Sequence, residues 1–319
     1  MQTPVLLIIW RRPHTLERVV EALRKVAPSH LYVACDGPNP ARPGEGAKVS
    51  AARELIKQQV NWPCQIRHLY SESNQGCRLG VSRALDWFFR EVEEGIILED
   101  DCVPHPDFFP FCQTLLQRYR HDSRVWCLSG SNFQNGRWRG DGDYYFSQYI
   151  HSWGWATWRR CWRHYDADLN LLEPLLALGL HNTIFNDPVE RRHWVKLWKK
   201  LRDQNKPDSW AYRWAFTCFV NGGLTALPNR NLVVNIGFDS DATHTRRKSG
   251  NSSAYHFSEG LPRLQAPSFL LRDLEADRYS FNHVFGGNSL RFPRVLYRAP
   301  ARLVSSLLRS LLQGLRSHG

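Results

Sequence analysis

The first hundred residues alternate between short apolar runs and longer amphipathic segments. Continuous or weakly alternating apolar runs of strand length occupy residues 5–10, 31–35, 64–70 and 96–98. The segments between them repeat apolar residues at helical spacing, over residues 13–27, 47–59 and 81–93. This alternation predicts an α/β fold with a mostly parallel central sheet, flanked by helices that connect its strands in the right-handed sense.

The remainder of the chain is less regular and rich in tryptophan. Ten of the thirteen Trp lie between Trp126 and Trp214, and we expect most of them to belong to the core. Helices are predicted over 108–120, 191–202 and 211–220, and strands over 125–130 and 232–236. Residues 303–315 repeat Leu and Val at i, i+4 and i+7 with Arg between them, which predicts an amphipathic C-terminal helix.

The net charge of +12 comes mostly from the C-terminal tail. Residues 278–319 contain seven Arg, no Lys and no acid, which leaves +5 for the other residues. A nucleic-acid-binding protein is expected to spread its basic residues over a folded face, so this distribution argues against nucleic acid as a partner. It favours contact between the tail and an anionic membrane surface. A helix that packs in a dimer is the alternative for the same segment.

Cysteine usage and the N-terminus bear on location. The eight Cys are scattered without a CxxC pair, which suits reduced thiols. Residues 1–13 lack the basic region and small-residue cleavage site of a signal peptide, and no apolar run reaches the ~18 residues that a membrane span needs. We therefore expect a cytoplasmic protein, attached peripherally to the inner face of the cell membrane through its tail.

Three consecutive acids, Glu99, Asp100 and Asp101, follow the apolar run at 96–98. At the carboxyl edge of a sheet they would lie close together, where carboxylates repel one another unless a cation lies among them. Oxygen ligands favour Mg²⁺ or Mn²⁺, with part of the coordination shell left for water and phosphate. The triplet therefore predicts a metal-diphosphate site, and a solvated acidic turn is the alternative.

Two further strand ends carry candidate binding groups. Asp36 follows the second strand and precedes Gly37, where its carboxylate would accept a nucleobase N–H or simply close a turn. Asn74, Gly76 and Arg78 lie at the next strand-to-helix turn, which offers backbone N–H groups and a guanidinium to phosphate. The pattern is neither a Walker A motif nor a Rossmann fingerprint.

Six segments in this order resemble nucleotide-sugar-dependent glycosyltransferases of the GT-A fold. The resemblance covers residues 1 to about 245 and is closest to bacterial family-2-like transferases and to the fold of N-acetylglucosaminyltransferase I. The matching segments are PVLLIIWRRP at 4–13, Asp36-Gly37, NQGCRLGVSRALDWFF at 74–89, GIILEDDCVPHPDFFPFC at 95–112, HSWGWATWRRCW at 151–162 and NLVVNIGFDSDATHT at 231–245. The resemblance implies one GT-A domain, with a nucleotide-sugar (donor) half at 1–130 and an acceptor and catalytic half at 131–260. The basic extension at 261–319 follows.

The resemblance also implies roles for the donor-binding residues. Asp36 would contact the nucleobase, and the ribose and diphosphate would be contacted by Asn74, Gly76 and Arg78. Trp153 and Trp155, in a Trp-Gly-Trp segment, would lie at the donor sugar, because Trp faces stack on sugar rings. Core packing is the alternative for both.

For the metal, the last acid of the triplet is the direct ligand in this fold. That residue is Asp101, with Asp100 nearer the ribose and Glu99 in support. His244 stands where GT-A enzymes often direct a late His toward the metal or phosphate, and a structural His is the alternative. The implied cofactor is Mn²⁺ or Mg²⁺, which would neutralise the leaving nucleoside diphosphate.

An inverting transfer needs a base that deprotonates the acceptor hydroxyl. Asp208, in Lys206-Pro-Asp-Ser-Trp210, resembles the acid before Trp in the N-acetylglucosaminyltransferase pattern. A helix N-cap is the alternative for Asp208, and Glu173 and Asp187 are weaker substitutes as the base. No acid closely follows the Trp-Gly-Trp segment, where galactosyltransferases carry one, and this departure favours Asp208.

The resulting hypothesis is a metal-dependent, inverting glycosyltransferase. Its partners would be a nucleoside-diphosphate sugar as donor and a glycan or lipid-linked acceptor. A sugar nucleotidyltransferase is one alternative, although Arg11-Arg12-Pro13 lacks the Gly-rich activation loop expected near its first strand. A catalytically silent sugar- or membrane-binding protein on the same fold is another.

Overall fold

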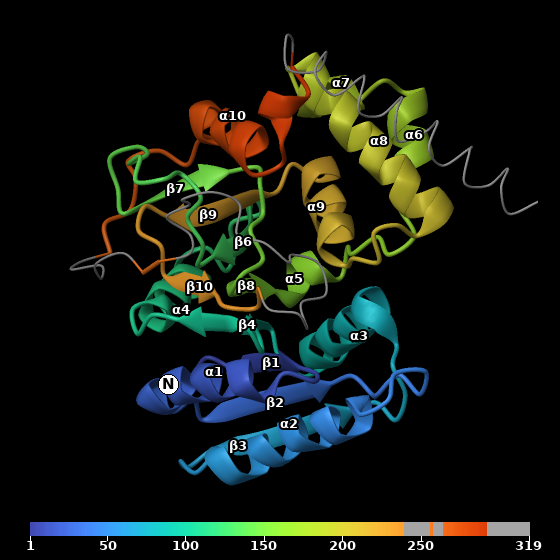
Figure 1. Ribbon diagram of the computed structural model, residues 1–319. Helices are drawn as coiled ribbons and strands as arrows, with labels where there is room; N and C mark the ends of the chain where they lie inside the picture. The colour runs from blue at the N-terminus through green and yellow to red at the C-terminus, as the bar shows by residue number, and fades with distance from the viewer. Residues whose placement is uncertain (239–255, 258–263, 292–319) are drawn as a thin grey trace, which may run out of the picture.

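A computed structural model describes residues 1–238, 256–257 and 264–291 (Figure 1). Strand–helix alternation runs through the first part of the chain. Its elements are β1 (Val5–Ile9), α1 (Pro13–Val26), β2 (His30–Cys35), α2 (Glu45–Gln59), β3 (Gln65–Tyr70), α3 (Gly76–Glu91), β4 (Glu94–Glu99), β5 (Cys102–Pro104), α4 (Phe108–Arg118) and β6 (Val125–Ser129).

The second part contains short strands and a group of helices. In chain order they are β7 (Tyr144–Ser147), β8 (Trp155–Trp158), α5 (Arg159–Trp162), α6 (Leu172–Ala177), α7 (His181–Ile184), α8 (Pro188–Gln204), α9 (Ala211–Val220), β9 (Leu224–Pro228), β10 (Val233–Asn235), α10 (Leu274–His283) and the 3-10 helix η2 (Gly287–Ser289). Figure 1 shows α6, α7 and α8 together at one corner of the molecule, above α9.

Eight strands form one sheet in the order β3-β2-β1-β4-β8-β6-β9-β7. Six of them point the same way, because only β8 and β7 pair antiparallel with their neighbours. The chain moves outward from β1 to β2 and β3 and then returns to β4 on the other side of β1. The strand order therefore reverses between β1 and β4, and the carboxyl ends of strands at such a point are where open α/β sheets bind ligands.

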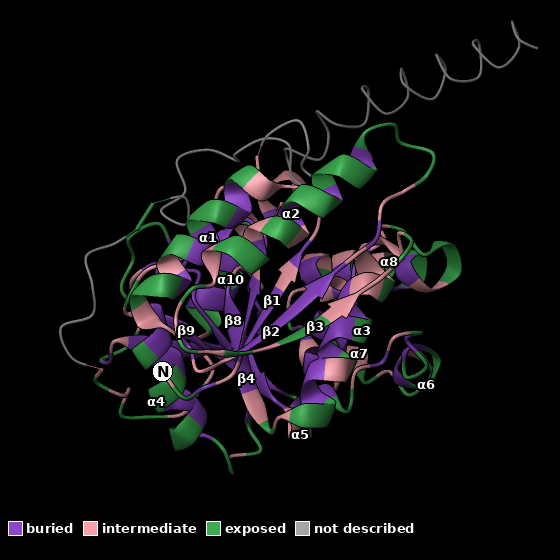
Figure 2. Ribbon diagram, turned by 90° about the horizontal axis from the view of Figure 1, so that it is seen from below, coloured by how far each residue is buried: buried purple, intermediate pink, exposed green. Residues whose placement is uncertain are grey.

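Helices cover both faces of the sheet. In Figure 2 the buried strands lie between α1 and α2 on one side and α3 and α5 on the other. The arrangement follows from right-handed crossovers, because the connections through α1 and α2 run in one direction along the sheet and the connection through α3 runs in the other. The predicted fold class, an α/β fold with a mostly parallel sheet flanked by helices, is confirmed.

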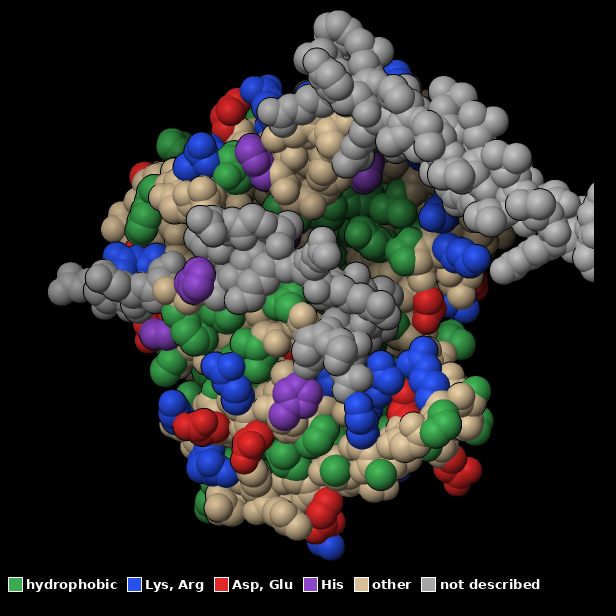
Figure 3. Space-filling view, viewed as in Figure 1, with side chains coloured by type: hydrophobic (Ala, Val, Ile, Leu, Met, Phe, Trp, Pro, Cys, Tyr) green, Lys and Arg blue, Asp and Glu red, His purple; other side chains and the backbone are tan. Residues whose placement is uncertain are grey.

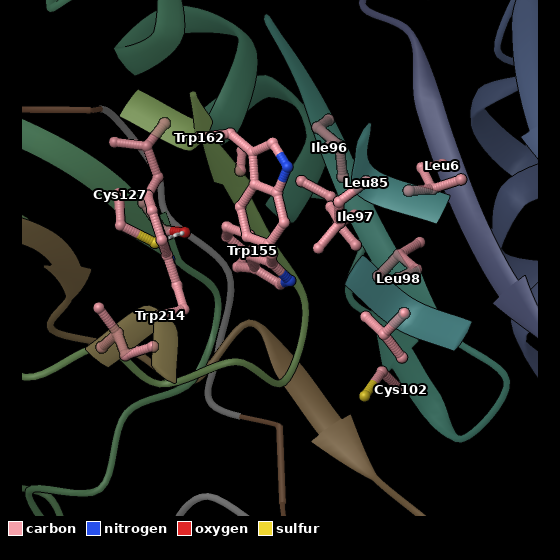
Figure 4. Close-up of a cluster of buried hydrophobic side chains, with 14 of the residues drawn as sticks. Leu6, Leu85, Ile96, Ile97, Leu98, Cys102, Cys127, Trp155, Trp162 and Trp214 are labelled. Carbon is pink, nitrogen blue, oxygen red and sulfur yellow. Dashed lines mark hydrogen bonds between the residues drawn. The ribbon is translucent and has the colours of Figure 1, made fainter. Parts of the chain in front are cut away.

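The core is dominated by aromatic side chains. Eight of the ten Trp in the Trp-rich segment are buried, which confirms that most of them are core residues. Figure 4 shows Trp155, Trp162 and Trp214 beside the β4 residues Ile96 and Ile97. Six of the eight free Cys are also buried, where a thiol packs as a small apolar group.

Two predictions about the C-terminal part concern residues that the structure does not describe. The amphipathic segment at 303–315 and His244 both lie outside the described residues. Within residues 1–238, 256–257 and 264–291, no helix has the length and apolarity needed to cross a bilayer.

Candidate active site

A cleft of about 1490 Å³ opens at the carboxyl ends of β1, β2 and β4. On one side it is lined by the residues that follow these strands, at 10–12, at Asp36 and at 99–101. On the other side it is lined by residues 149–153, 207–212, 279 and 283–285 from the second part of the chain. The cleft thus lies where the strand order reverses, and both parts of the chain contribute to it.

Arg12 binds two of the three acids. Its guanidinium donates to Asp101 Oδ2 at 2.8 Å and makes a short ion pair with Asp100 Oδ1. The backbone N–H of Trp10 donates to Asp100 Oδ2 at 3.0 Å. These contacts cross from β1 to β4, so the pairing of the two strands sets the geometry of the acids.

The pair of Arg12 and Asp101 is enclosed by Gly237. A Cβ atom at position 237 would lie 2.1 Å from Asp101 Oδ2 and 2.5 Å from Arg12 Nη1, so only glycine fits there. The Arg12, Asp100 and Asp101 side chains are 11%, 3% and 10% exposed. The ion pairs are therefore shielded from solvent. In such a buried site, a charge that loses its partner destabilises the folded protein.

Burial and mutual repulsion disfavour negative charge on Glu99 and Asp100. Burial and the neighbouring Asp101 raise the pKa of Glu99. Burial also raises the pKa of Asp100, while the charge of Arg12 opposes this shift. Burial lowers the pKa of Arg12, but Asp100 and Asp101 outweigh it and raise that pKa above the ordinary value. A bound cation would therefore stabilise the ionised form of these carboxylates.

The triplet has the donor chemistry of a hard divalent cation. Glu99 lines the cleft, and no hydrogen bond or ion pair joins its carboxylate to any residue in the part of the chain that the structure describes. Asp101, in contrast, shares Oδ2 with Arg12. Among the described residues, no group of three His, Cys, Asp or Glu is already arranged around a common point. The residues fit Mg²⁺ or Mn²⁺ by ligand type, with Glu99 as the open carboxylate and Asp101 shared with Arg12.

Asp36 joins the end of β2 to the start of α3. Asp36 Oδ1 accepts hydrogen bonds from the backbone N–H groups of Gly37 at 2.8 Å and Gln75 at 2.9 Å. Asp36 Oδ2 accepts from Gly76 N at 3.2 Å and from Asn74 Nδ2 at 3.0 Å. Burial raises the pKa of Asp36, whereas these N–H donors lower it. Asp36 thus caps α3 from a distance, in addition to lining the cleft.

This long-range cap explains where α3 begins. The apolar pattern predicts a helix from residue 81, yet α3 starts at Gly76 with φ +81°. The extra turn contains Arg78, Leu79 and Gly80, which contribute little to an apolar repeat. At its start, the N–H groups of Gln75 and Gly76 donate to Asp36, which is 39 residues from Gln75 in sequence.

Asp208 lies over the same helix start. A Cβ at Gly76 would be 2.8 Å from Asp208 Oδ2, so the glycine lets this carboxylate approach the end of α3. Burial, Glu99 and Asp208 together raise the pKa of Cys77 to about 12, so Cys77 lies within the field of both carboxylates. The alternative that Asp208 caps α9 is not supported, since α9 begins after Trp210 without a side-chain cap.

The two weaker candidates for a base lie elsewhere. Asp187 caps α8 by accepting from Val189 N at 2.9 Å, and it pairs with Arg291. Glu173 pairs with Arg202, and its side chain is 67% exposed. Neither of them is among the described residues that line the cleft.

Of the remaining donor-site residues proposed from the sequence, some line the cleft and others do not. Asn74, Gly76 and Trp153 line the cleft. Arg78 does not; its guanidinium lies 3.6 Å from Asp168. Trp155 is only 1% exposed and stacks on Trp210 with ring centroids 5.3 Å apart, within the core shown in Figure 4.

Several lining residues were not assigned a role from the sequence, among them Arg11, Arg12 and Arg42. Among the described residues, Arg83 is the fourth arginine that lines the cleft, and it belongs to the matching segment at 74–89. The double Arg directly after the first strand was the available signal for Arg11 and Arg12, because it lies at the same sheet edge as the acids. Arg83 sits seven residues after Gly76 in α3 and donates to Gln75 Oε1 at 3.2 Å, so it points back to the helix start.

A buried acid, Glu190, holds the loop at residues 148–149 beside the cleft. Glu190, in the first turn of α8, accepts a short hydrogen bond from Tyr149 Oη and one of 3.4 Å from Gln148 Nε2. Trp194 Nε1 donates to Tyr149 Oη at 3.1 Å. Burial raises the pKa of Glu190 to about 7, although the hydrogen bond from Tyr149 lowers it. The folded protein therefore holds this proton more tightly than the unfolded chain does.

The Glu190→Gln variant is expected to gain stability relative to wild type as pH rises. The carboxyl of the unfolded chain ionises near its ordinary pKa of about 4.3, whereas Glu190 in the folded protein ionises near 7. The free energy of unfolding of the wild type therefore falls as the pH rises between these two values. That of Glu190→Gln does not fall for this reason, because glutamine does not ionise. We expect a relative gain of about 1–3 kcal/mol between pH 4.5 and pH 8 in urea unfolding. Glu173→Gln, at an exposed acid, is the control; equal pH profiles for both variants would contradict the assignment.

Comparison with known proteins gives only distant likenesses. No protein-family model matches the chain, and no curated protein matches it. The mannosyltransferase PcManGT from Pyrobaculum calidifontis, solved with GDP-Man and Mn²⁺, is 13% identical, with a TM-score of 0.37 over 69% of this chain and 70% of its own. HddC from Yersinia pseudotuberculosis is 10% identical, with a TM-score of 0.33 over 53% and 83%. A UDP-glucose pyrophosphorylase solved with UDP-glucose is 9% identical, with a TM-score of 0.27 over 51% and 71%. Likeness at this level does not separate glycosyl transfer from nucleotidyl transfer, so the functional argument depends on the cleft.

Proposed function

We propose that this protein is a metal-dependent glycosyltransferase of the GT-A fold that transfers one sugar from a nucleoside-diphosphate sugar to a hydroxyl of a glycan or glycolipid. One observation carries the proposal: the acid triplet with Arg12 and the carboxylate of Asp208 border the same cleft, at the point where the strand order reverses. A donor whose diphosphate lies against the acids and the lining arginines would direct its sugar toward Asp208.

The reaction assigned to this geometry is a single displacement with inversion. The acceptor oxygen attacks the anomeric carbon and forms the new C–O bond as the bond from that carbon to the diphosphate oxygen breaks. The bonding electrons leave with the nucleoside diphosphate, and the acceptor proton passes to the carboxylate of Asp208. Asp208 is suited to this role because it lies beside the start of α3 and lines the same cleft as the acids.

The donor site contains residues with distinct tasks. Asp36 and Asn74 hold the start of α3 in place, so that the N–H groups after Gly76 and the side chain of Arg83 would face the diphosphate. Arg42, which also lines the cleft, would add a further cation. Trp153 offers an aromatic face to the donor sugar. Arg78 and Trp155 do not line the cleft, and the proposal assigns them no direct contact with the donor.

The metal is proposed at the acids. When bound, Mg²⁺ or Mn²⁺ would neutralise the diphosphate, with Asp101 and Glu99 as protein ligands and Asp100 holding Arg12 beside them. His244 is proposed as a further group toward the metal or phosphate. The Arg- and Leu-rich segment at 303–315 is proposed to contact an anionic membrane surface, which would bring a lipid-linked acceptor to the cleft.

A product assay tests the proposal against its alternatives. Incubation with nucleoside-diphosphate sugars and glycan acceptors should release nucleoside diphosphate and extend the acceptor. A sugar nucleotidyltransferase would instead release pyrophosphate from a nucleoside triphosphate and a sugar 1-phosphate. Nucleotide binding with neither product would favour the silent binding protein.

A further inference from the structure

The two sides of the cleft differ in charge. The side formed by residues up to 130 carries the acid triplet and every arginine among the described lining residues. On the side formed by later residues, Asp208 is the only Asp, Glu, Lys or Arg among the described lining residues. A nucleoside diphosphate suits the side with the arginines, so the side with Asp208 is left for a ligand of different chemistry.

A continuous aromatic wall forms part of the side that carries Asp208. It consists of five residues, named here the aromatic wall: Phe133, Tyr149, His151, Trp153 and Phe285, all of which line the cleft. Successive rings are in contact, with centroid distances of 5.0 Å (Trp153 to Phe133), 4.5 Å (Phe133 to His151), 6.3 Å (His151 to Phe285) and 4.9 Å (Phe285 to Tyr149). These residues come from the loops after β6, before β8 and after α10.

Three rings of the wall are partly exposed. Phe133, Trp153 and Phe285 are half-buried, whereas Tyr149 and His151 are buried behind them. Figure 3 shows hydrophobic side chains gathered in a hollow of the surface over α9. Half-buried aromatic rings in a concave surface bind flat apolar faces and leave the polar edge of a ligand to other groups.

His151 supplies an unsatisfied polar group within the wall. Its Nε2 atom is buried and has no hydrogen-bond partner among the described residues, although the residue lines the cleft. Burial lowers the pKa of His151 to about 3, so the imidazole is neutral at physiological pH. A buried polar atom without a partner is costly, and a ligand hydroxyl would remove that cost.

We propose that the aromatic wall is the acceptor subsite and that it binds an uncharged pyranose ring. A pyranose combines an apolar C–H face, which stacks on aromatic rings, with hydroxyl groups at its edge. An anionic acceptor would need cations on this side of the cleft, and the described lining residues there include no Lys or Arg. A ring stacked on Phe133 and Phe285 would hold a hydroxyl between the donor sugar at Trp153 and Asp208. This inference rests on the proposed glycosyl transfer and names the acceptor class for it.

Saturation-transfer NMR on the full-length protein tests the inference. The probes are methyl glucoside, methyl galactoside and methyl mannoside, the anionic methyl glucuronide, 1-octanol as an apolar chain, and UDP, GDP, CDP and TDP. We expect transfer to the ring C–H protons of at least one neutral glycoside and stronger binding of it than of the glucuronide. Phe133→Leu and Phe285→Leu keep apolar bulk but remove a flat ring, and each should weaken glycoside binding about three- to tenfold. Phe269→Leu, at a Phe that is 73% exposed and does not line the cleft, should leave it unchanged.

The outcomes separate this inference from the proposed function. Binding of a nucleoside diphosphate without any neutral glycoside would overturn the acceptor subsite alone. Octanol binding that survives both Leu variants, in the absence of glycoside binding, would make the wall a site for an acyl chain and overturn it as well. Failure of every nucleotide to bind would refute the proposed function. If one Leu variant does not fold, the other still decides the result, because the two residues lie on different loops.

Discussion

Replacing Asp208 with Asn is expected to lower the turnover number by about 10²–10⁴-fold, while nucleoside diphosphate binding stays within about twofold of wild type. The amide keeps the size and shape of the side chain but cannot take the acceptor proton. Asp208 lies over the start of α3 and lines the cleft, so the substitution changes the proposed reaction centre without removing a core side chain. Turnover is measured as nucleoside diphosphate release and binding by calorimetry.

Asp203→Asn provides the matched control for Asp208. Asp203 lies in the last turn of α8, pairs with the neighbouring Arg202, and has a side chain that is 53% exposed. The same chemical change there should leave both turnover and binding unaltered. Full activity of Asp208→Asn would remove Asp208 as the base and leave inversion without support.

Replacing Arg12 with Met is expected to destabilise the protein by about 3–5 kcal/mol. The substitution leaves Asp100 and Asp101 without their shared counter-ion in a site where their side chains are 3% and 10% exposed. Methionine retains the apolar stem, so the loss comes mainly from the charge. Urea unfolding of both proteins at neutral pH measures the change in the free energy of unfolding.

An exposed ion pair supplies the control for Arg12. Arg67 lies 2.5 Å from Glu91, and the two side chains are 55% and 39% exposed. Arg67→Met should cost no more than about 1 kcal/mol, because solvent screens such pairs. If Arg12→Met cost no more than Arg67→Met, the acids would not depend on Arg12, and our account of the charge balance in the cleft would be wrong.

The first part of the fold could be predicted from sequence because its elements have distinct periods. The apolar runs of β1, β2 and β4 and the helical repeat of α1 match the structure closely. The strands of the second part, β7, β8 and β9, were not predicted. Their segments are only four or five residues long and almost entirely buried, so they lack the alternation that identifies a strand.

The parts of the candidate site that are formed by residues adjacent in sequence could be predicted. Those that depend on contacts between residues far apart in sequence could not. The acid triplet and Asp208 were recognised from adjacent residues, and both line the cleft. The ion pairs of Arg12 join residues 88 and 89 positions apart, so only the pairing of β1 with β4 reveals them. Trp155 and Trp153 are two residues apart, and no local pattern indicates that the first lies in the core and the second in the cleft.

The most direct test of the proposed donor site is calorimetric binding of UDP, GDP, CDP and TDP, with and without Mn²⁺, to wild type and to Asp101→Asn. Glu99→Gln in the same experiment distinguishes two ligands for the ion: the carboxylate of Glu99, and that of Asp101, which is shared with Arg12. The account predicts that one nucleotide binds at least about tenfold more tightly with Mn²⁺ and that Asp101→Asn abolishes this gain. Binding of no nucleotide, or binding that ignores both Mn²⁺ and Asp101, would contradict it.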